Sequence, residues 1–364
     1  MYLITNRNIK ENTGGLEAVF DEVPNRKGPN ELRVAEIGKS GGKWRAEVLE
    51  DELGKAELAE LVKIYDLPSG PDAHYYRDLE VAHRVVTRAN KEKRNILIFV
   101  HGYNNDVKDV VERVDKLEKH YGVIVVPFSW PANGGGFKGL ADYKDDKNDA
   151  KASVVALDRL VGLIGRNLHI VTQKNLKRFR AQAQAKHPND AEKAHTLYTR
   201  LVEKDCPFTL NLMLHSMGNY LFKQMFKSSI SLGSGLVFDN VIMVAADANN
   251  LDHATWLERV RFKRRLYVTI NENDQALAAS RIKSGQDQLA RLGHVLYGLN
   301  AARAHYVNFT DSAWVGNSHA YFEGNPRAKN DHVHNFFKAA VNGERADKWL
   351  RYKADINCYE LKNS

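Results

Sequence analysis

The sequence predicts an α/β protein built on a mostly parallel, doubly wound sheet. Short runs such as Asn95–Val100 and Asn240–Ala245 are almost entirely apolar, which is typical of strands buried on both faces. Segments with apolar residues at helical spacing lie between these runs, as in residues 107–117. Strands that alternate with helices in this way favour parallel pairing. The polar residues that could carry chemistry come directly after the strands.

The first 90 residues have a different character and are expected to form an N-terminal extension. Helices are predicted over residues 51–66 and 72–92. Gly and Pro clusters separate four β-like pieces: Met1–Thr5, Leu16–Phe20, Glu31–Ile37 and Lys43–Val48. The extension either pairs with the main sheet or forms a separate module, and we find no chemistry in it.

Residues 91–345 are expected to form the main domain, followed by a mixed tail over 346–364. Its predicted strands are Asn95–Val100, Val123–Pro127, Phe208–Leu214, Asn240–Ala245, Arg265–Ile270 and Ala304–Thr310. Further helices are predicted over residues 150–164, 220–227, 253–260, 275–291 and 331–342. A Gly-rich loop, Gly134–Gly136, precedes the helix at 150–164.

Residues 165–205 form a helical, basic insertion that a strand-helix-strand crossover does not need. We expect it to sit above the strand ends as a cap; extra scaffold helices are the alternative. From Arg166 to Lys204 it carries nine Lys or Arg against three Asp or Glu, and a second cluster runs from Arg259 to Arg265. Such patches attract anionic partners, of which a membrane surface is one, but the favoured interpretation is a solvated helix face. A nucleic-acid partner is not expected, because no aromatic interleaving or binding motif accompanies the charge.

The remaining composition points to a reduced compartment. Cys206 and Cys358 show no metal-ligand spacing and are expected to be buried thiols. The start of the chain does not resemble a secretory signal, and no apolar run approaches the roughly 18 residues that would span a bilayer. The expected location is the cytoplasm. The sequence does not indicate an oligomeric state.

Ser216 is the candidate nucleophile. The apolar strand Phe208–Leu214 leads into Leu214-His215-Ser216-Met217-Gly218-Asn219, and a helix follows. A strand, a tight turn with a central Ser, and a helix together form the geometry of a nucleophile elbow. The usual pattern has Gly two residues before the Ser, where this chain has Leu214. The alternative interpretation is that Ser216 only caps the helix.

The candidate base and acid lie on loops that leave strand ends. His319, after the last strand, is the candidate base. Asp274 follows the preceding strand and is the preferred acid, while Asp247 is the second candidate. His332 and His334 lie on a predicted helix; with Asp331 they make only a weak metal-like cluster, which we discount. We expect no metal and no cofactor.

An oxyanion hole needs two backbone N–H groups. We assign one to Met217, the residue after the nucleophile, and the other to Tyr103 in the turn His101-Gly102-Tyr103. Gly102 would let the backbone approach the developing charge closely. His101 and His215 flank these two turns and are secondary candidates.

These motifs resemble a known family. The runs Phe99–Asn105, Phe128–Pro131 and Leu214–Asn219 are similar to the esterase- and lipase-like α/β hydrolases catalogued as domain of unknown function 900. Later stretches fit as well: Phe238–Ile242, Ala245–Asp247, Asn273–Leu277 and Asn317–Phe322. The resemblance covers about residues 94–342. It implies an α/β-hydrolase fold and a Ser–Asp–His hydrolase acting through Ser216, Asp274 and His319.

The sequence therefore favours a serine hydrolase that cleaves carboxylic esters, a lipid ester among them, through an acyl-enzyme. The alternative is a binding protein on a hydrolase scaffold, with a degenerate site and basic patches for an anionic partner.

Overall fold

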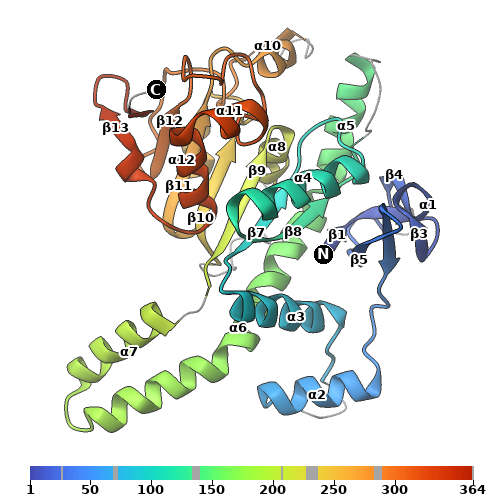
Figure 1. Cartoon of the computed structure of the whole chain (residues 1–364), viewed down its shortest axis with the longest axis vertical. Coiled ribbons are helices and arrows are strands. Elements are labelled where there is room, and N and C mark those ends of the chain that lie inside the picture. Colours follow the sequence, from blue (N-terminus) through green and yellow to red (C-terminus); the bar gives the residue numbers. More distant parts are fainter. Residues whose placement is uncertain are drawn as a thin grey trace.

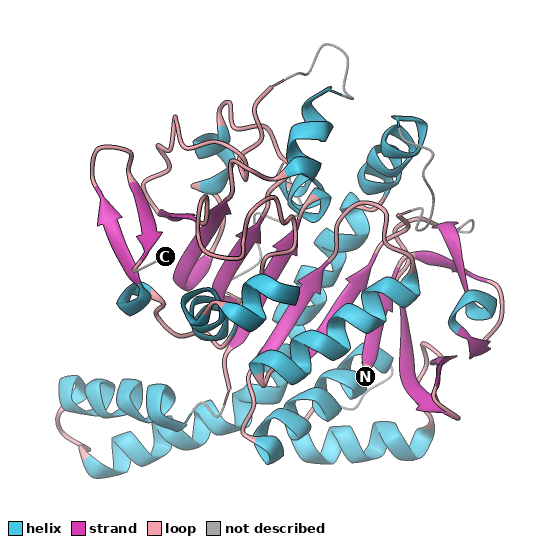
Figure 2. Ribbon diagram, turned by 45° about the horizontal axis from the view of Figure 1, so that its top comes forward, coloured by secondary structure: helices cyan, strands magenta, loops and turns pink. Residues whose placement is uncertain are grey.

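A computed structural model gives the fold, and it describes residues 1–25, 28–68, 73–132, 140–205, 208–226, 237–282 and 289–362. Within them a 12-stranded sheet runs through the molecule (Figures 1 and 2). Its strands, in spatial order, are β13 (Leu350–Lys353), β14 (Cys358–Leu361), β12 (Ala304–Asn308), β11 (Phe262–Ile270), β10 (Phe238–Val244), β9 (Leu210–His215), β7 (Ile96–Val100), β8 (Ile124–Ser129), β1 (Tyr2–Thr5), β5 (Arg33–Ser40), β6 (Lys43–Val48) and β3 (Thr13–Gly15).

The strands from β1 to β14 are parallel, as the alternating sequence predicted. The chain passes from β7 to β8 on one side and then returns to β9 on the other side of β7. The order of the strands therefore reverses between β7 and β9. In open α/β sheets the crevice outside the carboxyl ends at such a switch point is the usual place for a ligand.

Helices cover both faces of the sheet, and β7 shows how the two cores are divided. Ile96, Ile98 and Val100 belong to the core beneath α3 (Arg77–Glu92), α6 (Val154–Lys186) and α8 (Met217–Met225). Leu97 and Phe99 belong to the opposite core, with α4 (Val107–Tyr121) and α12 (Asp331–Val341). Since successive strand residues point to opposite faces, a strand between two helical layers must be apolar throughout.

The N-terminal region is part of the sheet and not a separate module. β1 pairs in parallel with β8, and β5, β6 and β3 extend the edge by antiparallel pairing. A second sheet pairs β2 (Arg7–Ile9) with β4 (Phe20–Pro24). The expected β piece Leu16–Phe20 is wrong, because Leu16–Val19 forms the short helix α1. Leu16 and Val19 are both buried at helical spacing, which a strand would send to opposite faces.

The C-terminal tail also joins the sheet. β14 pairs in parallel with β12, and β13 pairs antiparallel with β14 after the short helix η2 (Asp347–Trp349). Cys358 of β14 is a buried free thiol, whereas Cys206 and Gly134–Gly136 lie outside the described residues. The tail beyond residue 345 is thus not separate from the main domain.

The predicted insertion is the continuation of a helix that starts in the body of the protein. α5 (Leu140–Ala152) is followed by α6, whose 33 residues run through the expected boundary at 164 and 165. Such a helix is about 50 Å long, while a strand of six residues spans about 20 Å. Ser153, directly before α6, accepts a hydrogen bond from Asn6 at the carboxyl end of β1. The excess length of α6 therefore passes the amino ends of the strands (Figure 1).

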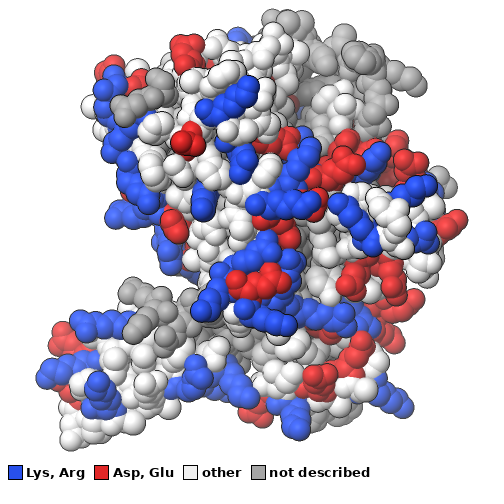
Figure 3. Space-filling model, in the orientation of Figure 1, with Lys and Arg blue, Asp and Glu red and all other residues white. Residues whose placement is uncertain are grey.

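The expected cap over the carboxyl ends is therefore wrong. Figure 1 shows the far half of α6 and α7 (Ala191–Asp205) as a hairpin that projects from the other end of the molecule. Figure 3 shows several Lys and Arg side chains on this hairpin. The exposed cations of its α6 arm are Lys174, Lys177, Arg178, Arg180 and Lys186.

The other helices are α2 (Lys55–Tyr65), α9 (His253–Leu257), α10 (Gln275–Ile282) and α11 (Gly324–Lys329). The helix expected over 275–291 is too long at its end, because Arg291 forms a β-bridge with Asn249. The described part of the chain contains no helix that is long and apolar enough to cross a membrane.

Candidate active site

Ser216 occupies a strained turn between β9 and α8. Its φ of 53° and ψ of −121° lie in a region that residues other than Gly rarely adopt. The backbone around it is held on both sides: the Ser216 N–H donates to the carbonyl of Val244 at 3.0 Å, and the Ser216 carbonyl accepts from Asn219 N at 3.0 Å and from Asp247 N at 3.2 Å. Strain of this kind persists only where the surroundings enforce it.

The side chain of Asn219 adds a second set of restraints to the turn. Its amide nitrogen donates to the carbonyl oxygens of Leu214 at 3.1 Å, Ser216 at 3.1 Å and Val244 at 3.2 Å. Asn219 is fully buried, so these bonds are not exchanged for bonds to water. Asn219 appears in the motif, but no sequence pattern assigned it this supporting role.

Glycines on both sides of Ser216 allow a close approach of the backbone. A Cβ at Gly218 would lie 2.7 Å from the carbonyl oxygen of His101, so α8 starts against the end of β7. A Cβ at Gly102 would lie 2.6 Å from the Cβ and 3.2 Å from the Oγ of Ser216. Leu214, which replaces the usual Gly, is fully buried, and its side chain packs in the core beneath α3, α6 and α8. The turn is thus accommodated without a Gly at that position.

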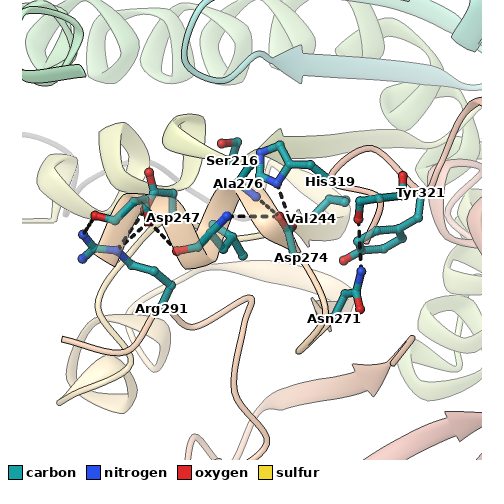
Figure 4. A network of polar contacts seen from close by, with 12 residues as sticks. Ser216, Val244, Asp247, Asn271, Asp274, Ala276, Arg291, His319 and Tyr321 are labelled. Atoms are coloured by element: carbon teal, nitrogen blue, oxygen red, sulfur yellow. Dashed lines mark hydrogen bonds and ion pairs between the residues drawn. The ribbon is translucent and has the colours of Figure 1, made fainter. Parts of the chain in front are cut away.

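His319 and Asp274 form a hydrogen-bonded pair beside Ser216 (Figure 4). The distance from His319 Nδ1 to Asp274 Oδ2 is 2.7 Å. The other carboxylate oxygen, Oδ1, accepts from the N–H groups of Ala276 at 2.9 Å and Leu277 at 3.0 Å, at the start of α10. Asp274 is fully buried, while the His319 side chain is 24% exposed. In a neutral ring, an Nδ1–H that donates to the carboxylate leaves Nε2 as the acceptor.

The loop of residues 311–323, here called the His319 loop, is anchored to the neighbouring strands. Asn271 Nδ2 donates to the carbonyls of Gly316 at 3.0 Å and Ser318 at 3.1 Å. Tyr321 is fully buried, with its hydroxyl 2.5 Å from Thr269 Oγ1. Burial raises the pKa of Tyr321 above its usual value, so the phenol stays protonated.

Arg113 of α4 links the His319 loop to the turn that follows β7. Its guanidinium donates to Glu323 Oε1 at 3.0 Å and to Asn105 Oδ1 at 2.8 Å. Arg7 supports the same turn from the N-terminal region, donating to the carbonyl of Asn105 at 3.0 Å. Arg7 is fully buried, and burial lowers its pKa to about 10. The sequence contains no signal for either arginine, and no chemistry is predicted for the segment that holds Arg7.

The two secondary histidines are buried within the walls of the site. His215 lies with its Nε2 3.0 Å from the His319 carbonyl and with ring centroids 4.8 Å apart. His101 is stacked on Trp130 at 5.2 Å, and its Nδ1 donates to the carbonyl of Gly102 at 2.9 Å. Burial lowers the pKa of His101 to about 3 and holds the pKa of His215 well below its usual value. Both rings are therefore neutral near pH 7.

Asp247, the other candidate acid, faces away from His319. Its Oδ1 lies 3.0 Å from Arg291 Nε and accepts from Ser280 Oγ at 3.0 Å (Figure 4). Both partners of this ion pair are almost fully buried. The structure thus brings Asp274, and not Asp247, to the histidine. The histidines of α12 also stay apart, since His334 stacks on Tyr121 and His332 lies against Trp349.

The two residues assigned to the oxyanion hole both lie at the carboxyl edge of the sheet, Met217 after β9 and Tyr103 after the neighbouring strand β7. Met217 is the first residue of α8 and is buried, while Tyr103 lies half-buried in the turn after β7. Among the described residues, no three His, Cys, Asp or Glu side chains gather as metal ligands.

A doubly wound sheet with a strained serine turn after a central strand, and a His–Asp pair after later strands, defines the α/β-hydrolase class. The sequence model of the family described as alpha/beta hydrolase of unknown function, DUF900, matches residues 78–174 and 184–316. These ranges cover most of the chain, so the protein belongs to this family. They include Ser216 and Asp274 and end three residues before His319. No curated protein and no solved structure matches the chain.

Proposed function

We propose that the protein is a serine hydrolase that cleaves carboxylic esters through an acyl-enzyme. The observation that carries the proposal is the hydrogen-bonded pair of buried Asp274 and partly exposed His319 beside the strained Ser216 turn. A nucleophile, a base and a group that orients the base are the three parts that acyl transfer requires.

In the first step, His319 Nε2 takes the proton of Ser216 Oγ as Oγ attacks the ester carbonyl carbon. Asp274 holds the ring in the required tautomer and stabilises the imidazolium that forms. When the tetrahedral intermediate collapses, the C–O bond to the alcohol breaks and His319 returns the proton to the leaving oxygen. Water then attacks the acyl-enzyme by the same route, which releases the acid and regenerates Ser216.

The oxyanion of both steps is assigned to the backbone N–H groups of Met217 and Tyr103. The first N–H of a helix points out of its N-terminus, where the helix dipole favours negative charge. The contact between Gly102 and Ser216 supports the second assignment, since it places the turn containing Tyr103 against the nucleophile. Loss of one such donor typically costs about a hundredfold in turnover or more.

Hydrolysis of a short p-nitrophenyl ester by the wild type and by Ser216→Ala tests the proposal. We expect the variant to lose about a thousandfold in kcat or more, with an unchanged melting temperature. Ser40→Ala, which removes an exposed hydroxyl at the end of β5, is the control and should keep full activity. Equal hydrolysis by the wild type and Ser216→Ala would contradict the mechanism.

A second candidate function is binding of an anionic partner on a degenerate hydrolase scaffold. The exposed cations of the α6–α7 hairpin favour it. A fluorophosphonate probe separates the two, because it reacts only with an activated serine. Labelling of the wild type that disappears in Ser216→Ala supports the hydrolase, whereas a wild type that takes no label supports the binding protein.

A further inference from the structure

A cavity of about 460 Å³ lies between α3, α6 and one face of the sheet. Its floor is formed by strand residues near the amino half of the sheet, among them Ile96, Ile98 and Leu210. None of the described residues that line it belongs to the Ser216 turn, the turn after β7 or the His319 loop. Pockets of about 300–1,000 Å³ are the usual size for small-molecule sites. We call this space the α3–α6 cavity.

The α3–α6 cavity is elongated along the helices. On α6 its lining runs from Arg159 to Val171, which is about 18 Å of helix, and on α3 it runs from Arg77 to Val86, about 13 Å. The residues between are mainly Val, Leu, Ile and Ala. An elongated and mainly apolar space suits an extended alkyl chain better than a compact ring system.

Among the described residues that line the cavity, one cation is not paired with a carboxylate. Arg33 pairs with Glu31 at 2.7 Å, Arg77 with Glu57 at 2.9 Å and Arg166 with Asp78 at 2.9 Å. Arg159, also in the lining, forms no ion pair with any described carboxylate and is exposed. Its guanidinium lies 3.5 Å from the carbonyl of Asn30. An arginine fork matches the geometry of a carboxylate, as it does that of a phosphate.

Asn167 supplies a second polar point inside the cavity. It is 3% exposed, and its Nδ2 donates to Asp78 Oδ2 at 2.7 Å, which fixes Oδ1 as the acceptor. Asn167 Oδ1 has no hydrogen-bond partner among the described residues. Buried acceptors in proteins usually have a hydrogen-bond partner, and the hydroxyl of a bound ligand could be the partner of this oxygen. Arg159 and Asn167 are eight residues apart on α6, about 12 Å along the helix.

We propose that the α3–α6 cavity binds a long-chain fatty acid, with the carboxylate at Arg159 and the chain lying between α3 and α6. Asn167 Oδ1 then accepts a hydrogen bond from a hydroxyl near the middle of the chain. A mid-chain hydroxy acid should therefore bind more tightly than the plain acid of the same length. The site is separate from Ser216, so the proposal does not depend on ester hydrolysis.

Displacement of the fluorescent fatty acid cis-parinaric acid from the full-length protein tests the proposal. We expect saturable binding to one site, displacement by octadecanoic acid, and displacement by 12-hydroxyoctadecanoic acid at severalfold lower concentration. Arg159→Gln should weaken both acids about tenfold and leave the methyl ester of octadecanoic acid unaffected. Arg178→Gln, which removes an exposed arginine of α6 beyond the cavity, is the matched control and should bind as the wild type does.

Ala82→Phe provides an independent test from inside the cavity. Ala82 lines the space from the half-buried side of α3, so a ring there fills the chain site, and binding should be lost while the melting temperature is kept. Full binding by Ala82→Phe, equal affinity of wild type and Arg159→Gln, or an absence of saturable displacement would each overturn the proposal. Loss of binding after Ser216 is labelled or changed to Ala would place the acid at the other site and overturn it as well. Equal affinity of the plain and hydroxylated acids would show that the chain does not lie along Asn167, contrary to the proposed placement.

Discussion

The carboxyl edge of the sheet and the α3–α6 cavity use the same central strands but are built in opposite ways. At the edge, polar groups restrain one another: Asn219 donates to three carbonyls around Ser216, and Asp274 receives His319 and two backbone N–H groups. In the cavity, apolar walls enclose space, and Asn167 keeps an unpartnered acceptor. At the carboxyl edge, strained backbone and hydrogen bonds fix the positions of the reacting groups. In the α3–α6 cavity, the side chains leave a space that a ligand can fill.

The largest expected effect concerns the two buried acids at the carboxyl edge. Asp274→Asn should lower kcat for ester hydrolysis by about ten-thousandfold with little loss of stability, because an amide cannot hold the His319 tautomer or balance its charge. Asp247→Asn should instead cost about 3–5 kcal/mol of unfolding free energy, since Arg291 keeps its charge in a buried site. Steady-state kinetics and denaturant unfolding of both variants measure the two effects.

The pair of variants provides its own control, because each makes the same chemical change after a neighbouring strand. If Asp247→Asn lost activity and Asp274→Asn only stability, the roles assigned to the two acids would be reversed. If Asp274→Asn kept wild-type kcat, the proposed mechanism would fail at its orienting group.

The carboxyl edge could be predicted from the sequence because its signals are local. The apolar runs specified the central strands, and the loops after them supplied the candidates Ser216, Asp274 and His319, which lie together in the structure. The preference between Asp274 and Asp247 followed from strand order. No sequence pattern indicated that Arg291, which is distant in the chain, forms an ion pair with Asp247.

The α3–α6 cavity could not be predicted, because its lining comes from distant segments without a shared motif. Ile4, Val81, Ile98, Leu160 and Leu210 each look like ordinary core residues in the sequence. Whether such residues close the core or leave a space depends on how far apart two helices settle, which periodicity does not contain. The cap was mispredicted for a related reason: helical character gave the length of α6 but not the direction in which its excess projects.

Enlarging one side chain at the carboxyl edge and one in the α3–α6 cavity should affect ester hydrolysis differently, with a smaller effect than the change of Asp274. Gly102→Ala places a methyl group 2.6 Å from Ser216 Cβ, so the turn or the serine must shift. A displacement of about 1 Å at reacting groups can cost a hundredfold in rate, and we expect a loss of that order in kcat. Ala82→Phe adds far more volume but enters an open space, so its ester hydrolysis should stay within twofold of wild type.

The same kinetic assay checks both variants, with melting temperatures to confirm that each is folded. A fully active Gly102→Ala would show that the turn after β7 yields easily and that the edge is not rigid. An inactive but folded Ala82→Phe would show coupling between the cavity and Ser216, which would break the contrast between the two regions.

The smallest expected effect is on acid stability, and it also belongs to the carboxyl edge. Burial lowers the pKa of His101 to about 3, below its usual value near 6.5. In the folded state this ring stays neutral, while in the unfolded chain it gains a proton below pH 6.5. Its contribution to stability is therefore fully present above pH 6.5 and is lost as the pH falls toward 3. Between pH 7.5 and 5.5 the loss from one such histidine is about 1.4 kcal/mol.

His101→Asn removes the titrating ring but keeps a side-chain N–H at about the position of Nδ1. The variant should be less stable than the wild type at pH 7.5. Between pH 7.5 and 5.5, however, the decrease in its unfolding free energy should be about 1.4 kcal/mol smaller than the decrease in the wild type. The described residues that line the α3–α6 cavity include no histidine, so Ala82→Phe should keep the wild-type slope and serves as the control. Denaturant unfolding at the two pH values measures both. An unchanged slope in His101→Asn would mean that the acid sensitivity arises outside the turn after β7, and that this part of the edge does not depend on a neutral histidine.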